Sequence, residues 1–211
     1  MTTSHEPFAT LCPAPAAAEV RPSRGRARDV TWRRVVAYAF AAALLGLAHP
    51  RSGPLWPAGF AAGAALALAG EALRVWGCGH LRKNQHVVTS GPYARVRNPL
   101  YLGTLFILVG VCLAAGQPVV LFGLLPAGLA AFFLYYTPKK ERIESDRLRR
   151  RFGRRYERYH AAVPGYVPRL TRWEKASRDR WSAALVVENS EVETVLFVVA
   201  GLAVLAVRAF V

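Results

Sequence analysis

Two polar stretches hold most of the side chains that could take part in chemistry. The first, residues 77–103, reads GCGHLRKNQHVVTSGPYARVRNPLYLG, and the second, residues 139–160, reads KKERIESDRLRRRFGRRYERYH. In a helix, the second stretch places Glu141 and Glu144 on the same face. A carboxylate held against an apolar surface is unfavourable unless it is paired, so either glutamate is a candidate ligand for a cationic group. Helical geometry alone does not choose between them.

Other classes of chemistry find little support in the residue types. The three cysteines, Cys12, Cys78 and Cys112, are too few and too scattered for a disulfide framework or a four-ligand zinc site. Cys112 lies in an apolar run with no base near it in the sequence, which favours a core position over a catalytic one. His80 and His86 lie six residues apart without a cysteine or a paired carboxylate beside them. We therefore expect no metal site.

The composition indicates the setting in which these stretches work. The chain of 211 residues is 53% hydrophobic and 19% charged, so disorder is not expected to be its main state. Its net charge of +15, from 28 Lys and Arg against 13 Asp and Glu, is typical of proteins that bind nucleic acid. The basic residues, however, lie between long apolar runs, which is the pattern of membrane proteins. We therefore expect a membrane protein without a nucleic-acid partner.

Five apolar runs are interpreted as membrane-spanning helices. They cover residues 31–48, 54–76, 100–115, 118–136 and 192–211. Only Gly116 and Gln117 separate the third run from the fourth, which predicts a tight helical hairpin. The first run also resembles a signal peptide, but the long sequence before it favours a span. With a rise of about 1.5 Å per residue against a hydrocarbon core of about 30 Å, the expected fold is an all-α, multi-pass transmembrane bundle of about five spans.

The distribution of basic residues predicts the orientation of these spans. Six basic residues lie between Arg21 and Arg34, before the first run and at its start, four lie in residues 77–99 and fifteen in residues 137–191, of the 28 in the chain. Because basic loops stay on the cytoplasmic side, we expect the N-terminus and both long loops to be cytoplasmic and the C-terminus to lie outside. Contact with anionic lipid then contributes about 1 kcal/mol per basic residue near the surface.

A basic helix is expected after the fourth span. Its apolar residues recur at spacings of four, four and three and form one stripe, made of Leu148, Phe152, Tyr156 and Tyr159. Such a stripe on a very basic helix is typical of an amphipathic helix that lies in the membrane interface.

The remaining segments carry simpler expectations. Residues 1–30, which include Pro13, Pro15 and Pro22, are predicted to be a disordered cytoplasmic tail. Residues 171–191 are predicted to be a linker to the last span, which offers small residues for contact with another helix at Ala200, Gly201 and Ala203. Glu71 and Arg74, the charges inside the second span, are three residues apart and are expected to pair with each other.

Taken together and in order, these motifs resemble the isoprenylcysteine carboxyl methyltransferase and phospholipid methyltransferase family. The resemblance rests on VVTSGPY at 87–93, on RNPLYLG at 97–103 and on a pattern of single residues after the hairpin, namely Glu144, Leu148, Phe152, Gly153, Tyr156, Tyr159, Val163 and Pro164. It covers roughly residues 72–170. The domains implied are a membrane methyltransferase domain over 31–170 and an additional linker and transmembrane helix over 171–211.

The family's members are integral membrane enzymes that use S-adenosylmethionine as a co-substrate, bound in a pocket at the cytoplasmic face. The resemblance implies cofactor contacts from Gln85, His86, Val87, Val88, Tyr93, Arg97, Asn98, Pro99, Leu100, Tyr101 and Glu144. It places Lys140 near the substrate, and no catalytic residue is assigned. Two positions depart from the family pattern: Arg-His-Pro is replaced by Arg-Asn-Pro, and Glu-Glu by Glu144-Ser145. The Asn98 variant resembles the phosphatidylethanolamine methyltransferases.

The expected function is therefore methyl transfer in the cell membrane from S-adenosylmethionine to a hydrophobic or lipid-borne acceptor. The acceptor stays open between a carboxylate of the isoprenylcysteine type and a phospholipid amine, and a small transporter or scaffold is the non-enzymatic alternative. The family pattern, counted back from Phe152 and Gly153, selects Glu144 over Glu141 as the working carboxylate. If Glu141 meets only lipid headgroups or neighbouring arginines, its neutralisation should cost under about 1 kcal/mol. Glu144→Gln is therefore expected to raise the dissociation constant of the cofactor far more than Glu141→Gln.

Overall fold

The structure, a computed structural model of the chain, describes residues 56–83 and 85–210, and these residues form helices and loops without a strand. The all-α prediction is confirmed for this part of the chain. The predicted tail over 1–30 and the predicted first span over 31–48 lie outside the described residues.

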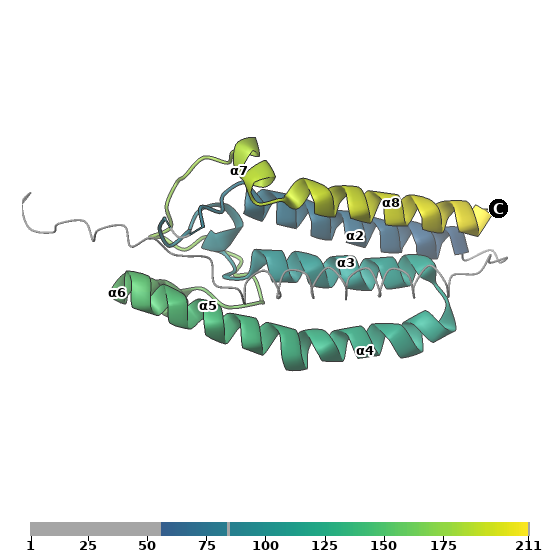
Figure 1. Ribbon diagram of the computed structural model, residues 1–211, viewed down its shortest axis with the longest axis horizontal. Coiled ribbons are helices and arrows are strands. Elements are labelled where there is room, and N and C mark those ends of the chain that lie inside the picture. The colour runs from purple at the N-terminus through teal and green to yellow at the C-terminus, as the bar shows by residue number, and fades with distance from the viewer. Residues whose placement is uncertain (1–55, 84, 211) are drawn as a thin grey trace, which may run out of the picture. The chain divides into compact units, whose positions relative to one another are not determined.

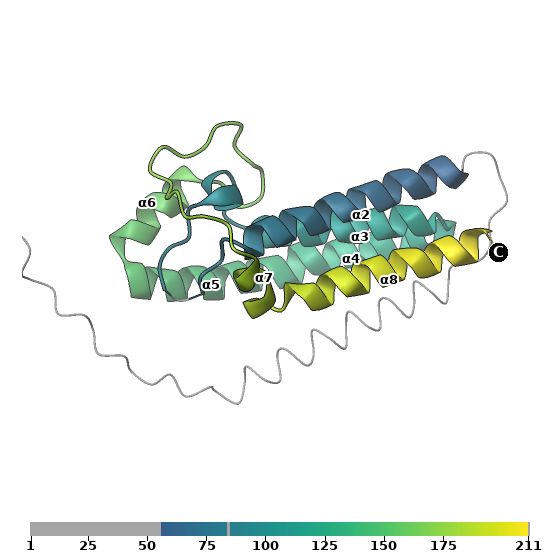
Figure 2. The ribbon, with the colours of Figure 1, turned by 90° about the horizontal axis from the view of Figure 1, so that it is seen from above.

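Three long helices, α2 (Trp56–Cys78), α3 (Pro99–Ala115) and α8 (Glu191–Phe210), lie side by side in both views of the ribbon (Figure 1, Figure 2). A further long helix runs from Val120 to Phe152. It consists of a π-helical turn η2 (Val120–Leu124), α4 (Leu125–Ala130), a second π-helical stretch η3 (Ala131–Tyr136) and α5 (Thr137–Phe152). The predicted hairpin between α3 and α4 is confirmed, because α3 ends at Ala115 and Gly116 follows in the left-handed conformation at φ 61°.

Two of the described helices are long and apolar enough to cross a membrane. They cover Pro57–Cys78 and Val120–Phe152, while α3 is apolar but shorter, at 17 residues. The membrane character of the chain is therefore supported, and the count of five spans stays a prediction.

Glycine residues allow α2 and α3 to approach each other closely. A Cβ atom built on Gly70 of α2 would lie 2.6 Å from the carbonyl oxygen of Gly103 of α3, and one built on Gly110 would lie 2.6 Å from the carbonyl oxygen of Gly63. Both distances are shorter than any ordinary contact of a Cβ atom. Small residues at such positions bring two helix backbones into contact, which is how membrane helices gain packing energy.

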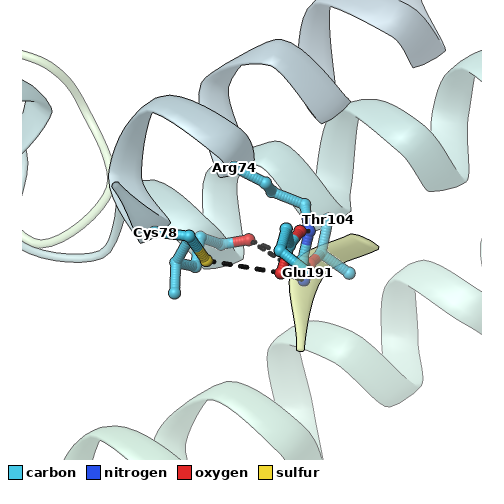
Figure 3. A network of polar contacts seen from close by, with 5 residues as sticks. Arg74, Cys78, Thr104 and Glu191 are labelled. Carbon is cyan, nitrogen blue, oxygen red and sulfur yellow. Dashed lines mark hydrogen bonds and ion pairs between the residues drawn. The ribbon is translucent and has the colours of Figure 1, made fainter. Parts of the chain in front are cut away.

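Helix α8 joins this pair through a part-buried ion pair (Figure 3). Arg74 of α2 donates from Nε to Glu191 Oε1 at 2.6 Å and from Nη2 to Glu191 Oε2 at 2.9 Å. Its Nη1 donates to Thr104 Oγ1 of α3 at 2.6 Å, and the thiol of Cys78 donates to Glu191 Oε2 at 3.3 Å. The network therefore links all three helices.

The predicted pairing of Arg74 with Glu71 is wrong. Glu71 is buried and makes no hydrogen bond to Arg74 within the described residues. The expectation considered only the neighbouring turn of the same helix, whereas the carboxylate of Glu191, 117 residues away in sequence, meets the guanidinium with two hydrogen bonds. A bidentate pair is stronger than a single contact between adjacent turns.

The basic segment after the fourth predicted span is two helices rather than one. Helix α5 ends at Phe152, Gly153 adopts φ 49°, and α6 (Arg154–Ala162) starts in a new direction. The apolar stripe of Leu148, Phe152, Tyr156 and Tyr159 packs on residues from two other segments, Val87, Val163 and Trp173. The stripe was expected to face a membrane interface; it faces the protein instead, because these segments supply an apolar surface for it.

The basic helices α5 and α6 lie at one end of the long helices, which we call the polar end (Figure 1, Figure 2). A 3-10 turn, η1 (Gly91–Ala94), lies there together with α5, α6 and α7 (Ala183–Glu188), whereas the α3–α4 turn and the end of α8 lie at the opposite end. The two basic segments, 77–99 and 137–191, thus share one end of the helices.

Because the α2–α3 contact leaves no room for a side chain, Gly70→Ala should lower the free energy of unfolding by about 2 kcal/mol. Gly59→Ala is the matched control on the same helix, since nothing lies within 4 Å of a Cβ atom there. Reversible unfolding in mixed detergent micelles measures both. Equal stability of the two variants would contradict the close contact.

Glu191→Ala should leave the part-buried charge of Arg74 without its carboxylate partner and lower the free energy of unfolding by about 3 kcal/mol. Glu188→Ala, at an exposed position on α7, serves as the control and should have little effect. The same unfolding measurement applies, and a loss no larger than that of the control would show that the ion pair does not anchor α8.

Candidate functional site

A cavity of about 260 Å³ opens at the polar end of the helices. Four segments supply its wall: the loop after α2, the η1 turn with the residues that precede α3, helix α5 and helix α6. The lining residues are Leu81, Arg82, Lys83, His86, Val87, Val88, Tyr93, Arg97, Asn98, Glu141, Glu144, Ser145, Arg147, Leu148, Tyr156 and Tyr159. This volume is slightly below the usual range for small-molecule sites, about 300–1,000 Å³.

Buried hydrogen bonds shape the loop that forms one side of the cavity. Gly91 adopts φ 58°, and the ring of His80 packs against it. His80 Nδ1 lies 3.1 Å from Ser90 Oγ, and burial lowers the pKa of His80. The hydroxyl of Tyr159 on α6 donates to the carbonyl of Tyr93 at 2.9 Å. These contacts connect the η1 turn with α6 and give this part of the cavity a defined shape.

Residues 164–173, which we call the strap, run beside residues 94–98. Four backbone hydrogen bonds of 2.9–3.1 Å connect the two segments: Arg97 N to Pro164 O, Asn98 N to Gly165 O, Arg169 N to Arg95 O and Trp173 N to Ala94 O. The strap therefore holds the chain in place just before α3 begins.

The segment predicted to be a simple linker, 171–191, also contacts the loop after α2. Ser177 N donates to Thr89 Oγ1 at 2.9 Å, and Asp179 Oδ2 lies 3.5 Å from Nε2 of His86 in the cavity wall. A hydrogen bond from Ser177 is the main cause that lowers the pKa of Asp179. Asn189 Nδ2 donates to two carbonyls at the end of α2, those of Cys78 and Leu81. The linker is thus part of the support of the site.

The carboxylates of Glu141 and Glu144 and the guanidinium of Arg97 lie in the cavity wall. Arg97 Nη2 donates to Glu141 Oε1 at 3.1 Å, and the hydroxyl of Tyr166 donates to Glu141 Oε2 at 3.0 Å. The hydroxyl of Tyr101 donates to Glu144 Oε2 at 3.2 Å. Arg97 Nε and Nη1 are buried and have no hydrogen-bond partner among the described residues. A buried donor without a partner is unfavourable, so Arg97 is suited to bind an anionic group.

The structure brings most of the predicted site residues together. Seven of them line the cavity, namely His86, Val87, Val88, Tyr93, Arg97, Asn98 and Glu144. Five do not line it: Gln85, Pro99, Leu100, Tyr101 and Lys140. Among these, Tyr101 reaches the site through Glu144, whereas the carbonyl of Leu100 accepts hydrogen bonds from Thr104 and Arg74. Their assignment to a cofactor stays a prediction.

Several lining residues were not predicted as part of the site. Arg82, Lys83 and Arg147 add positive charge to the wall, and Ser145 Oγ lies 2.8 Å from Tyr156 Oη, both of them buried. Charged residues in a basic loop give no local signal that separates the cavity wall from the solvent-facing side. Ser145 stands where the resemblance implies a second glutamate.

Glu141 contacts more than the lipid headgroups or neighbouring arginines that were considered from the sequence. Arg97 is a residue of the cavity wall, and the hydroxyl of Tyr166 occupies the second oxygen of the carboxylate. The sequence offered no hint of this arrangement, because Arg97 lies 44 positions and Tyr166 lies 25 positions from Glu141.

The site can bind a ligand that carries both signs of charge. Arg97 offers unpaired donors to an anion, Glu144 offers a carboxylate to a cation, and Val87, Val88 and Leu148 offer apolar surface beside them. Among the described residues, no group of three or more His, Cys, Asp or Glu side chains is placed to hold a metal ion.

Comparison with known proteins points to a family. Residues 60–155 match the model of the phospholipid methyltransferase family. The cobalt-zinc-cadmium resistance protein CzcN of Cupriavidus metallidurans is 31% identical over 153 residues, which cover 69% of this chain and 66% of that protein. No solved structure matches the chain. The resemblance seen in the sequence motifs is thus confirmed, by a match to the phospholipid methyltransferase family that covers 96 of the 211 residues.

Proposed function

We propose that this protein is an integral membrane methyltransferase that uses S-adenosylmethionine to methylate a hydrophobic or lipid-borne acceptor. The observation that carries the proposal is the cavity at the polar end of the helices, in whose wall the unpaired donors of Arg97 and the carboxylate of Glu144 both lie. The family match supports the reaction type.

The residues of the cavity fit the chemical groups of S-adenosylmethionine. Its amino-acid end carries a carboxylate and an ammonium group, which need a cationic donor and an anionic acceptor. Arg97 Nε and Nη1 are buried donors without a partner, and Glu144 accepts a hydrogen bond from Tyr101 on one oxygen. The aliphatic side chains Val87 and Val88 line the same cavity and offer apolar surface to the adenine ring.

The mechanism asks little of the chain beyond positioning. When bound, S-adenosylmethionine would supply a methyl group on a positively charged sulfur. In an in-line displacement, the acceptor's electron pair would form the new bond to the methyl carbon as the carbon–sulfur bond breaks, and the neutral thioether S-adenosylhomocysteine would leave with the electron pair. The residues of the cavity bind and orient the reactants and exclude water. Positioning and exclusion of water are the main contributions of a protein to the rate of such a displacement. Tyr93 and Tyr159, both almost fully buried, join the two walls of the cavity and keep its shape.

The acceptor belongs to one of two classes, a carboxylate of the isoprenylcysteine type or a phospholipid amine. The description of the matching family favours the phospholipid, and so does Asn98 in the place of the histidine of the Arg-His-Pro motif. Arg82, Lys83 and Arg147 in the cavity wall favour an acceptor that carries a carboxylate or a phosphate, which both classes do. Identification of the methylated product decides between them.

The orientation follows from the placement of the basic segments. We propose that the polar end of the helices, with the cavity, lies on the cytoplasmic side of the cell membrane, where the cofactor is soluble. A lipid-borne acceptor would then reach the cavity sideways from the bilayer. The gathering of segments 77–99 and 137–191 at one end supports this orientation, since basic loops remain in the cytoplasm.

Glu144→Gln should raise the dissociation constant of S-adenosylmethionine about a hundredfold, because it leaves the ammonium group of the ligand unpaired in a partly dry site. Asp146→Asn, an exposed acid on the same helix, is the control and should bind like the wild type. Calorimetry on the purified proteins measures both. Equal losses of affinity in the two variants would indicate a purely structural helix. Absence of saturable binding in the wild type would contradict the proposed function and is the result expected of a transporter or scaffold.

The orientation is tested by single cysteines in a cysteine-free background. Gln85→Cys, in the loop after α2, should be protected in intact cells from a membrane-impermeant thiol reagent, whereas Val119→Cys, at the α3–α4 turn, should be labelled. Both positions are exposed in the structure. The opposite pattern would invert the proposed topology.

A further inference from the structure

We infer that Glu141 is a positioning residue for Arg97: it holds the guanidinium in the orientation in which its remaining donors receive the carboxylate of S-adenosylmethionine. This inference deepens the proposed function and rests on it. The two glutamates of the cavity wall then have different roles: Glu144 binds the ammonium group of the ligand, and Glu141 orients Arg97, which binds the carboxylate group.

The contacts of Arg97 divide its donors into two groups. Nη2 is committed to Glu141 Oε1 at 3.1 Å, whereas Nε and Nη1 have no partner within the described residues. The side chain of Arg97 is 13% exposed, so water does not satisfy these donors freely. An arginine with one anchored nitrogen cannot turn without losing that bond, and the free donors therefore keep a fixed direction. A preorganised donor binds an anion without first losing side-chain entropy.

Glu141 is itself held from a second direction. The hydroxyl of Tyr166 in the strap donates to Oε2 at 3.0 Å, and burial together with this bond to a carboxylate raises the pKa of Tyr166, so that the phenol remains a donor. Each carboxylate oxygen of Glu141 thus has a protein partner. This leaves Glu141 poorly placed to bind a ligand and well placed to support Arg97.

The strap closes the arrangement around the guanidinium. Its backbone accepts from Arg97 N at Pro164 and from Asn98 N at Gly165. A Cβ atom at Gly165 would lie 3.3 Å from Arg97 Nη2 and 3.5 Å from Glu141 Oε1, so the strap passes close beside the ion pair. The strap therefore bonds the backbone of Arg97 directly, and through Tyr166 it bonds Glu141 of α5, which holds the side chain.

If Glu141 only supported the fold, its loss would also weaken binding. Comparing two ligands distinguishes support of the fold from orientation of Arg97. Decarboxylated S-adenosylmethionine retains the ammonium group, the sulfonium and the nucleoside and lacks only the carboxylate. Loss of the fold around Arg97 would weaken both ligands, whereas loss of its orientation would weaken only the ligand that Arg97 contacts.

The experiment is a calorimetric titration of the full-length protein in lipid nanodiscs with each of the two ligands. The wild type should bind S-adenosylmethionine about tenfold more tightly than the decarboxylated form, the usual effect of one charge-assisted hydrogen bond. Glu141→Gln should lose about tenfold in affinity for S-adenosylmethionine and less than about twofold for the decarboxylated form. Glu141→Asp should recover part of the difference, and Asp146→Asn on the same helix should bind both ligands like the wild type.

Equal weakening of both ligands in Glu141→Gln, or no weakening at all, would overturn the inference while leaving the proposed function intact. A wild type that binds neither ligand would overturn the proposed function itself. If Glu141→Gln fails to fold, Tyr166→Phe removes only the hydroxyl that holds the glutamate and should show the same selective loss to a smaller degree. If Tyr166→Phe instead changes the affinity for both ligands by the same factor, or changes neither, the role of Glu141 is contradicted.

Discussion

The close contact of α2 and α3 is the constraint on which the rest of the described structure depends. Because Gly63 and Gly70 meet Gly110 and Gly103 with no room for a side chain, the two helices are fixed relative to each other along their length. The end of α2 at Cys78 and the start of α3 at Pro99 therefore lie close together at the polar end. The loop between them must fold over that end, and this loop carries much of the cavity wall.

Polar contacts attach the remaining elements to the α2–α3 pair. Arg74 and Glu191 attach α8, the strap holds the residues before α3, and Asp179 and Asn189 hold the loop after α2. Much of this support comes from the chain after residue 155, beyond the part that matches the family model. The cavity thus owes its shape to segments that a family comparison alone would set aside as a tail. The two glutamates of the cavity wall differ in their contacts. Both carboxylate oxygens of Glu141 have protein partners, whereas Glu144 accepts a hydrogen bond from Tyr101 on one oxygen.

The sequence predicted those features that depend on local pattern. Apolar runs marked the helices, Gly116 marked the hairpin, and the motifs around Tyr93, Asn98 and Glu144 marked residues that meet in one cavity. The features it missed depend on contacts between distant residues. Arg74 pairs with Glu191 rather than with Glu71, the apolar stripe of α5 and α6 faces Val87, and Glu141 reaches Arg97. The stripe itself was visible in the sequence, but periodicity does not say which surface will cover it.

The most direct test of the account is to locate the bound cofactor by photolabelling. Ultraviolet irradiation of the purified protein with S-adenosylmethionine labelled in its methyl group, followed by peptide mapping, reports which residues touch it. We expect saturable labelling, competed by unlabelled S-adenosylmethionine, within residues 81–98 or 141–159, the segments that supply the cavity wall. Label confined to other segments, or labelling that neither saturates nor is competed, would contradict the assignment of this cavity as the cofactor site.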